Sequence, residues 1–317
     1  MPALREYRAM KPPALVLVVG ATGALGRPAV KLLRERGVAV RALSRHPEQA
    51  ADLAALGADV VAGDLTDPAS LQRACQGATR VLACAHGLLG RGRATSEAVD
   101  DAGHRALLAA ARAAGVERFV YTSALGAHDG HPIDFFRTKA RIEAAVRAGG
   151  MPCAILRPSA FMEHHVHNFN GKGLLDKGKA QLIGPGTKQR NFVAGSDVAT
   201  LAMHALLEDP LPFSTLDIGG HDHYSNLDIV RLYAQAAGIE PRVSHLPSGV
   251  ARALAVLARP LHPGMARVMK LLSLPDDAFE ECYDGAAALE TRFGLRLMRV
   301  PDFVREQVVL AGRRPAH

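Results

Sequence analysis

The chain has 317 residues, 48% of them hydrophobic, which is enough to bury one large core or two smaller ones. Its net charge is +7, but lysine and arginine are spread along the whole length, aromatic residues make up only 5%, and tryptophan is absent. This pattern disfavours nucleic acid as a partner, because nucleic-acid surfaces combine a basic stripe with interleaved aromatics. No apolar stretch is long enough to span a membrane, so no integral membrane segment is predicted.

The cysteines and the first residues bear on the cellular compartment. Four cysteines are scattered without the spacing of a metal site or a redox pair: Cys75, Cys84, Cys153 and Cys282. Residues 1–13 are basic and contain no apolar signal core, so we expect a loose tail rather than a secretion signal. Both observations favour a reducing, cytoplasmic setting.

The most informative stretch is an apolar run, Val16–Val19, that leads directly into three glycines, Gly20, Gly23 and Gly26. A helical pattern follows from Leu25 to about Arg36. An unbroken apolar run is typical of a buried parallel strand, and the free N–H groups at the start of the following helix can bind an anion. The stretch therefore predicts a dinucleotide diphosphate site. The glycines recur at every third residue rather than as G-x-G-x-x-G, and an ordinary glycine-rich turn is the alternative.

The end of the second predicted strand, Val38–Leu43, indicates which dinucleotide is bound. An acidic residue about twenty positions after the glycines would bind the ribose 2′-hydroxyl of NAD. This chain has Ser44 and Arg45 there instead. The guanidinium of Arg45 can pair with a 2′-phosphate, so NADP(H) is preferred over NAD(H); a solvated surface arginine is the alternative.

Strands and helices alternate up to Pro158. Four more strands are predicted at Asp59–Val61, Val81–Ala85, Arg118–Ser123 and Pro152–Pro158, with a long amphipathic helix from Glu97 to Ala114. This alternation predicts an α/β fold, a Rossmann-type doubly wound parallel sheet of about seven strands. The regular pattern then stops. We therefore assign residues 14–160 to a dinucleotide-binding domain and 161–317 to a smaller, mostly helical cap built onto the sheet rather than an independent domain.

Taken together, these features resemble the short-chain dehydrogenase/reductase superfamily, and most closely its atypical, NmrA-like branch of NAD(P)-binding proteins. The resemblance covers about residues 14 to 237 and rests on the glycine stretch and five further segments: Gly63-Asp64-Leu65, Val120–Ser123, Lys139 with Glu143, Leu156–Glu163 and Asp197–Ala199. The glycine triplet is its most specific part.

The resemblance implies a role for each matching position. Thr22, Leu25 and the three glycines would hold the diphosphate, and Asp64 and Leu65 would flank the adenine, although Asp64 could equally cap the helix that begins near Pro68. Further along the chain, Ala85 and His86 would lie near the ribose. The nicotinamide would be surrounded by Ser123, Lys139 and the turn from Pro158 to Phe161. The catalytic candidates are Lys139 and Ser123.

Position 135 departs from the superfamily pattern. Reductases of the superfamily use a Tyr-x-x-x-Lys pair, whose i, i+4 spacing brings both side chains together on one helix face. Here Phe135 precedes Lys139, and a phenyl ring has no proton to give. Some relatives, such as those like isoflavone reductase and NADPH-quinone reductase, work with the lysine alone, whereas others only sense the nucleotide.

Several histidines could replace the missing tyrosine as proton donor, because histidine titrates near neutrality. The candidates are His128, His131 and the cluster His164, His165 and His167. Glu163 together with this cluster could also suggest a metal site, but the spacing matches no zinc motif, and no metal is predicted.

The stretch from Val250 to Leu274 predicts two short apolar helices, interrupted at Pro260 and Pro263. It contains four basic residues: Arg252, Arg259, Arg267 and Lys270. A membrane-surface helix has this composition. We favour a core or pocket-lid helix pair, and burial against a second subunit is also open.

The predicted function is an NADP(H)-dependent oxidoreductase that transfers hydride to a small carbonyl, quinone or enone, with a homodimer as a possible assembly. The alternative is a non-catalytic NAD(P)-sensing regulatory protein that binds a protein partner, an alternative that the missing tyrosine favours. A sugar-nucleotide epimerase or dehydratase is a third reading, which the missing tyrosine weakens.

Overall fold

A computed structural model describes residues 15–90, 92–274 and 282–313. The predicted tail, residues 1–13, lies outside the described residues. The centre of the fold is a seven-stranded sheet in the order β10-β6-β5-β4-β1-β2-β3, with every strand pair parallel. Its strands are β1 (Val16–Val19), β2 (Val40–Ser44), β3 (Asp59–Ala62), β4 (Arg80–Ala83), β5 (Arg118–Thr122), β6 (Cys153–Pro158) and β10 (Thr215–Ile218). The predicted doubly wound sheet is confirmed.

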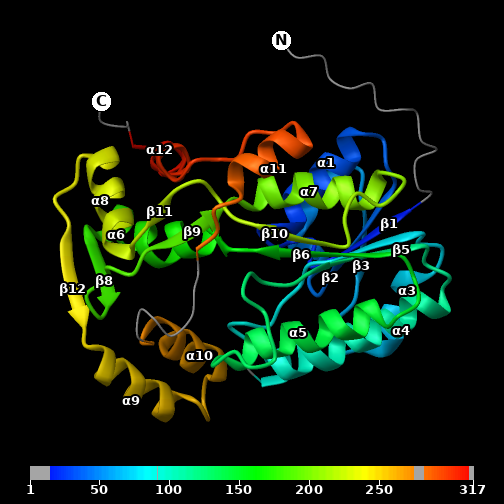
Figure 1. Cartoon of the computed structure of the whole chain (residues 1–317), viewed down its shortest axis with the longest axis horizontal. Coiled ribbons are helices and arrows are strands. Elements are labelled where there is room, and N and C mark those ends of the chain that lie inside the picture. Colours follow the sequence, from blue (N-terminus) through cyan, green and yellow to red (C-terminus); the bar gives the residue numbers. More distant parts are fainter. Residues whose placement is uncertain (1–14, 91, 275–281, 314–317) are drawn as a thin grey trace.

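Helices cover both faces of this sheet (Figure 1). One face carries α1 (Gly26–Glu35), α7 (Gly195–Leu207) and α11 (Ala286–Phe293); the other carries α3 (Pro68–Cys75), α4 (His104–Ala113) and α5 (Asp134–Arg147). Within β1, Val16 and Val18 pack into the first layer and Leu17 and Val19 into the second. Both faces of the strand are therefore buried, which explains its unbroken apolar run. At the β2–β3 end lie two short helical pieces, η1 (Pro47–Gln49) and α2 (Ala51–Ala55).

The long helix predicted from Glu97 to Ala114 is divided into two parts. Its first part, η3 (Glu97–Gly103), is π-helical, and the α-helix α4 begins only at His104; a one-turn helix, η2 (Gly92–Ala94), precedes both. A Cβ on Gly103 would lie 2.8 Å from the Leu65 side chain, so the segment approaches the sheet closely. Wide π-helical turns are concentrated at functional sites.

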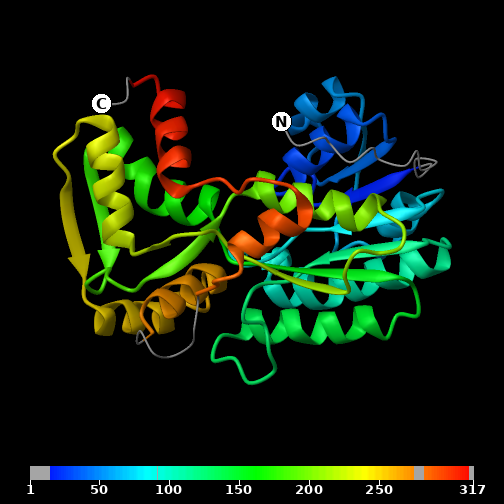
Figure 2. The ribbon, with the colours of Figure 1, turned by 45° about the horizontal axis from the view of Figure 1, so that its top comes forward.

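The cap is assembled from segments far apart in the chain (Figure 2). A small sheet joins β7 (Ala160–Phe161), β9 (Arg190–Val193) and β11 (His223–Tyr224), and a second pairs β8 (Lys179–Ile183) with β12 (Arg242–Leu246) in parallel. Four helical segments enclose a third core beside them: η4 (Met162–Gly171), α6 (Lys172–Lys177), α8 (Asn226–Ala237) and α12 (Val300–Leu310). The sequence also predicts short strands at Asn191–Val193, Leu216–Gly220 and Val243–Leu246, which correspond to β9, β10 and β12, but no pattern indicates β7 or β8.

Two elements that follow residue 160 return to the central sheet. Helix α7 packs against α1, and β10 adds an edge strand beside β6. The division at residue 160, with a cap that depends on the sheet, remains our prediction.

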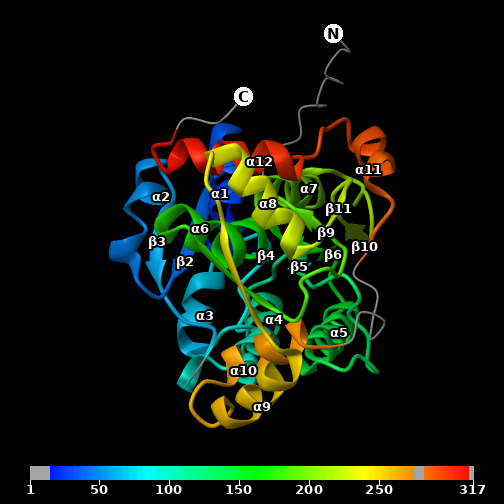
Figure 3. The same cartoon turned by 90° about the vertical axis from the view of Figure 1, so that its left-hand side faces the viewer.

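The two apolar helices expected between Val250 and Leu274 are present as α9 (Ser248–Ala258) and α10 (Pro263–Leu272). They project together from the side of the molecule opposite α12 (Figures 1 and 3). Within the described residues, no helix is both long and apolar enough to cross a bilayer.

Candidate functional site

The glycine turn after β1 is shaped by two close approaches of backbone. Gly20 has φ +96°, and a Cβ there would lie 2.5 Å from the amide nitrogen of Ala85. A Cβ on Gly26 would lie 2.1 Å from the carbonyl oxygen of Gly20. At Gly23 the nearest atom is 3.3 Å away. The fold itself therefore requires glycine at the first and third positions, whereas Gly23 mainly leaves the adjoining cleft open.

This turn forms one wall of a cleft of about 410 Å³ at the carboxyl ends of β1, β2 and β4. Most predicted cofactor-binding residues line it: Gly20, Thr22, Gly23, Leu25, Arg45, Asp64, Leu65, Ala85, His86 and Phe161. Gly26 lies beneath the turn and does not line the cleft. Lys139, Ser123 and Pro158 line an adjoining pocket instead. The predicted residues thus come together in two neighbouring hollows.

The end of β2 carries Ser44 and Arg45 into the cleft, as the sequence indicated. Ser44 is buried, and its hydroxyl accepts a hydrogen bond from the His46 amide at 3.1 Å. Asp64 accepts hydrogen bonds from the amide and hydroxyl of Thr66 at 2.8 and 3.0 Å, while Asp67 caps α3. The helix-cap alternative for Asp64 is therefore wrong.

The second pocket, of about 140 Å³, continues from the first and shares Cys84, His86, Leu89, Phe161 and His164 with it. Its other walls are mostly apolar and include Phe135, Phe136 and Phe169, together with Leu271 from α10. Burial raises the pKa of the Cys84 thiol to about 12, so this cysteine stays protonated at neutral pH. The pocket offers a flat or aromatic molecule apolar contact and few charges.

Lys139 lies at the floor of the second pocket and is only 2% exposed. Its Nζ donates to the Thr122 carbonyl at 3.0 Å and lies 3.7 Å from a carboxylate oxygen of Asp100. Burial lowers its pKa, and Asp100 opposes that shift. Lys139 is thus buried, and its charged partner is Asp100 rather than Glu143, four residues further along the same helix.

Asp100 is a site residue that the sequence reasoning missed. It is fully buried in η3, where both carboxylate oxygens accept from the Gly87 amide at 3.1 Å and one also accepts from the Ser96 hydroxyl. It therefore ties Lys139 to the loop after β4. The signal available in the sequence was an acidic residue within the amphipathic helix predicted from Glu97 to Ala114, since a buried acid normally needs a partner.

Glu143 belongs to a separate cluster behind Ser123. The side chain of Arg157 donates to both of its carboxylate oxygens at 2.8 and 2.6 Å. Arg157 and the Ser123 hydroxyl lower the Glu143 pKa against the effect of burial. Ser123 is 5% exposed and lines the pocket, and its hydroxyl faces the Glu143 carboxylate. Because the pKa of Glu143 is lowered, this carboxylate is a weak base for activating a nucleophile.

Three histidines face the two hollows. The His86 ring lies 6.4 Å from the Phe135 ring and 6.2 Å from the His164 ring. Burial lowers the pKa of His86 to about 4, with Lys139 and His164 adding to the shift and Asp100 opposing it. Burial also lowers the pKa values of His164 and His165. These imidazoles are neutral at pH 7 and act there as hydrogen-bonding groups rather than as acids.

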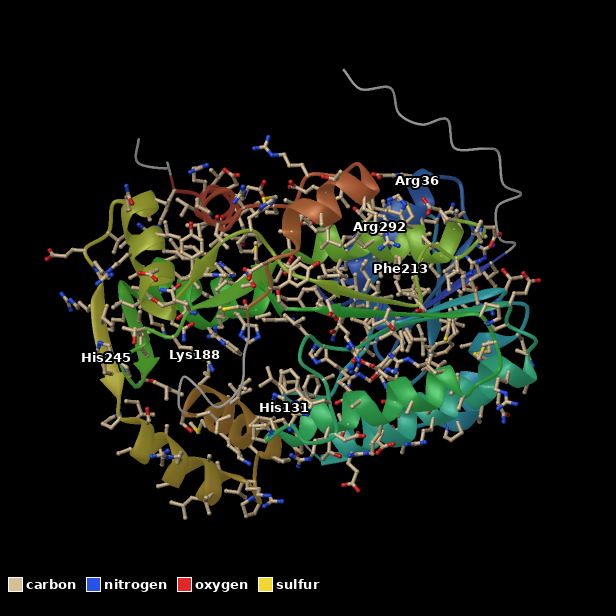
Figure 4. The ribbon with its side chains drawn as sticks, viewed as in Figure 1. Arg36, His131, Lys188, Phe213, His245 and Arg292 are labelled. Carbon is tan, nitrogen blue, oxygen red and sulfur yellow. The ribbon has the colours of Figure 1, made fainter. Side chains whose placement is uncertain are left out.

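The remaining histidine candidates lie elsewhere. His167 turns into the cap, where its Nδ1 is 3.1 Å from the Tyr233 hydroxyl. His131 is stacked on Phe136 and lies near α10 and the start of α5, as Figure 4 shows. Tyr121 cannot replace a catalytic tyrosine, because its side chain is fully buried, lines neither hollow, and has a pKa raised well above its usual value.

The parallel sheet, the glycine turn and the cleft at the strand ends define a dinucleotide-binding type of α/β protein. The chain belongs to the NmrA-like family, whose model matches residues 12–282. The resemblance inferred from its motifs is therefore confirmed.

Individual relatives differ in what they do. An NAD(P)H azoreductase of Xenophilus azovorans is 28% identical over 71% of this chain and 74% of its own length. Photosystem II assembly factor Ycf39 of Guillardia theta is 26% identical over 73% of each chain. Among solved structures, an NADPH-dependent quinone oxidoreductase of Escherichia coli complexed with NADPH superposes with a TM-score of 0.70 and 22% identity. It covers 92% of this chain and 99% of its own, a likeness that shows the fold.

Proposed function

We propose that this protein is an NADP(H)-dependent reductase whose acceptor is a quinone or a related conjugated system. The observation that carries the proposal is the adjoining pair of hollows: a glycine-walled cleft opens into an apolar pocket with a buried lysine at its floor. The azoreductase relative supports the reaction class. A cytoplasmic location is part of the proposal, since none of the four cysteines, all within the described residues, forms a disulfide.

The residues of the first cleft fit a dinucleotide. Gly23 leaves room for a diphosphate against the start of α1, whose free N–H groups attract an anion. Arg45, at the end of β2, can form charge-assisted hydrogen bonds with a 2′-phosphate, and Ser44 and Arg45 present no carboxylate that would repel it. We therefore propose a preference for NADP(H) over NAD(H).

Within the second pocket, the bound nicotinamide would supply a hydride. Lys139, held by Thr122 and Asp100, is placed to bind ribose hydroxyls and orient the cofactor. Phe135, Phe136 and Phe169 exclude water and stack an acceptor. Neutral His164 and His165 can hydrogen-bond an acceptor oxygen without being able to protonate it strongly.

The lack of a strong acid favours quinones over aldehydes. Reduction of a quinone by hydride produces a phenolate-like anion, whose conjugate acid has a pKa of about 10, as in tyrosine. Such an anion can leave the pocket and take its proton from water. An aldehyde produces a far more basic alkoxide, which needs an acid at the position of Phe135. The Phe135 ring therefore selects against aldehydes.

NADPH oxidation by the purified chain tests this proposal with a water-soluble quinone, an enone and an aldehyde as acceptors. We expect oxidation with the quinone and little with the aldehyde. Phe135→Tyr should raise aldehyde reduction about tenfold relative to quinone reduction by supplying a proton donor. Oxidation that does not depend on any acceptor, or equal rates with quinone and aldehyde, would contradict the proposed acceptor class.

The phenyl ring of Phe135, which stands where reductases of the superfamily have a tyrosine, also supports a second function. If NADPH binds tightly and no acceptor is reduced, the chain is a nucleotide-sensing regulatory protein with a protein partner. The assembly-factor relative favours that outcome. Binding measured by NADPH fluorescence on the same sample separates the two functions.

A further inference from the structure

The outer face of α9 and α10 is the largest group of exposed apolar side chains among the described residues. Val256, Leu257 and Leu261 are 73%, 72% and 84% exposed, and Val250, Leu254 and Met265 are further exposed apolar side chains on the same two helices. We call these six residues the α9–α10 face. Side chains of this size are seldom so exposed together without a partner. The core or pocket-lid role that we favoured for these helices accounts for their inner side only.

The charged side chains that residues 241–274 contribute to this region are all of one sign. Residues 241–274 contain Arg242, Arg252, Arg259, Arg267 and Lys270 and no aspartate or glutamate. Arg267 is used internally, because it donates to the Asp134 carboxylate at 2.8 and 3.1 Å. Arg252 and Arg259 are exposed, and within the described residues no carboxylate pairs with either. Exposed leucines flanked by unneutralised arginines match the chemistry of an anionic bilayer surface.

The face is fixed beside the opening of the apolar pocket. Arg267 also donates to the Leu88 carbonyl at 2.9 Å, and a Cβ on Gly264 would lie 2.3 Å from the Leu89 backbone. Leu271 of α10 lines the pocket, and Leu89 lines both hollows. A partner that docks on the α9–α10 face would therefore lie next to the apolar pocket.

We propose that the α9–α10 face docks the protein on an anionic lipid surface as a peripheral, non-spanning contact. A second copy of the chain fits this face poorly, because a two-fold contact would bring Arg252 and Arg259 of both copies together, and residues 241–274 hold no acid to neutralise them. The docking does not depend on the reductase activity.

Flotation of the full chain with vesicles tests the proposal, using phosphatidylcholine alone and phosphatidylcholine mixed with phosphatidylglycerol. We expect binding to the mixed vesicles at least about tenfold stronger than to the neutral ones, with the difference lost at high salt. The pair Leu257→Asp and Leu261→Asp should reduce vesicle binding about tenfold or more. Arg252→Gln with Arg259→Gln should remove the preference for anionic lipid.

Helix α12 supplies the matched control. Val309 and Leu310 are 55% and 77% exposed on the opposite side of the molecule, so Val309→Asp with Leu310→Asp should leave vesicle binding unchanged (Figure 3). Equal losses in both pairs of variants, or no vesicle binding by the unchanged chain, would overturn the proposal. So would a dimer, measured by light scattering, that only the Leu257 and Leu261 changes dissociate.

Melting and NADPH oxidation, measured on the same samples, distinguish the docking proposal from the reductase proposal. All six substituted positions are exposed, so the variants should melt like the unchanged chain and oxidise NADPH with a water-soluble quinone at the same rate. Absent turnover with every acceptor would remove the reductase proposal while leaving the vesicle result intact.

Discussion

The two hollows of the site are built in different ways. The cofactor cleft is built around the glycine backbone at the ends of neighbouring strands, and all but two of its lining residues come from the first hundred residues. The apolar pocket is walled by large side chains from β5, α5, η4, β9 and α10. A backbone-walled cleft tolerates no added atoms, whereas a wall of side chains can be altered one contact at a time. We therefore expect substitutions in the first hollow to act on all dinucleotides and those in the second to act on chemistry.

The largest effect should come from Gly23→Val. A Cβ at Gly23 would meet only the Gly20 carbonyl oxygen, at 3.3 Å, so the chain should fold, while the valine side chain would occupy the space proposed for the diphosphate. We expect NADPH and NADH affinity to fall more than about 100-fold, since a misplaced diphosphate loses several hydrogen bonds at once. Fluorescence titration measures both affinities.

Substitutions at two other glycines, Gly249 and Gly26, serve as controls. Gly249→Val, where a Cβ meets nothing within 4 Å, should leave both affinities unchanged. Gly26→Ala should instead prevent folding, because its Cβ would meet the Gly20 carbonyl. Retained NADPH binding by a folded Gly23→Val variant would show that the diphosphate lies elsewhere.

Lys139→Met should lower turnover about 100-fold and also destabilise the protein, because it leaves Asp100 buried without its cation. Loss of one partner of a buried pair costs about 3–5 kcal/mol. The double variant Lys139→Met with Asp100→Asn should recover most of the lost stability but none of the turnover. Thermal melting measures the stability of these variants, and NADPH oxidation on the same samples measures their turnover.

Recovery of turnover in the double variant would mean that Lys139 is only structural. Asp100→Asn alone provides the comparison, since it keeps an acceptor for the Gly87 amide while weakening the hold on Lys139.

Arg45→Ala should affect one cofactor only. Loss of charge-assisted hydrogen bonds to a 2′-phosphate should weaken NADPH binding about 10- to 50-fold, from about 1.5–2.5 kcal/mol. NADH binding should stay the same. Arg36→Ala, at the far end of α1, is the matched control and should change neither affinity (Figure 4). Equal weakening of both cofactors would contradict the NADP(H) preference.

The smallest effect on either hollow is expected from Asp197→Asn, in α7. Burial raises the pKa of this carboxyl from 3.8 to about 6, and Glu163 adds to the shift. The folded chain therefore holds this proton more tightly than the unfolded chain. Burying the carboxylate lowers the free energy of unfolding progressively as pH rises from about 4 to 6, and the full cost persists above that range.

Asparagine removes that pH-dependent cost and can still accept from the Met298 amide, which donates to Asp197 at 2.8 Å. Urea unfolding at several pH values should show a variant whose stability falls less between pH 4 and 6, by at most about 3 kcal/mol. Cofactor affinity should not change. An identical pH profile in both proteins would mean that the carboxyl titrates normally.

The sequence predicted the central sheet well because its inner strands β1, β4 and β5 are buried along their whole length and consist mostly of apolar residues. Gly20 and Gly26 are examples: the glycine spacing visible in the sequence is also what the close backbone contacts of the fold require. The cap was predicted poorly, since β8 and β7 depend on partners sixty or thirty residues away and have no pattern of their own. Asp100 escaped prediction for a similar reason, because only the fold brings it to Lys139.

Strand β10 has a consequence for how the chain is made. It fills the edge beside β6 only after the chain has passed through most of the cap. During synthesis, the backbone groups of β6 that face β10 remain unpaired until Ile218 has left the ribosome, although β5 already pairs with its other edge. An open strand edge pairs readily with other chains. Polypeptides that stop before Thr215 should therefore aggregate, and nascent chains of that length should be substrates for chaperones.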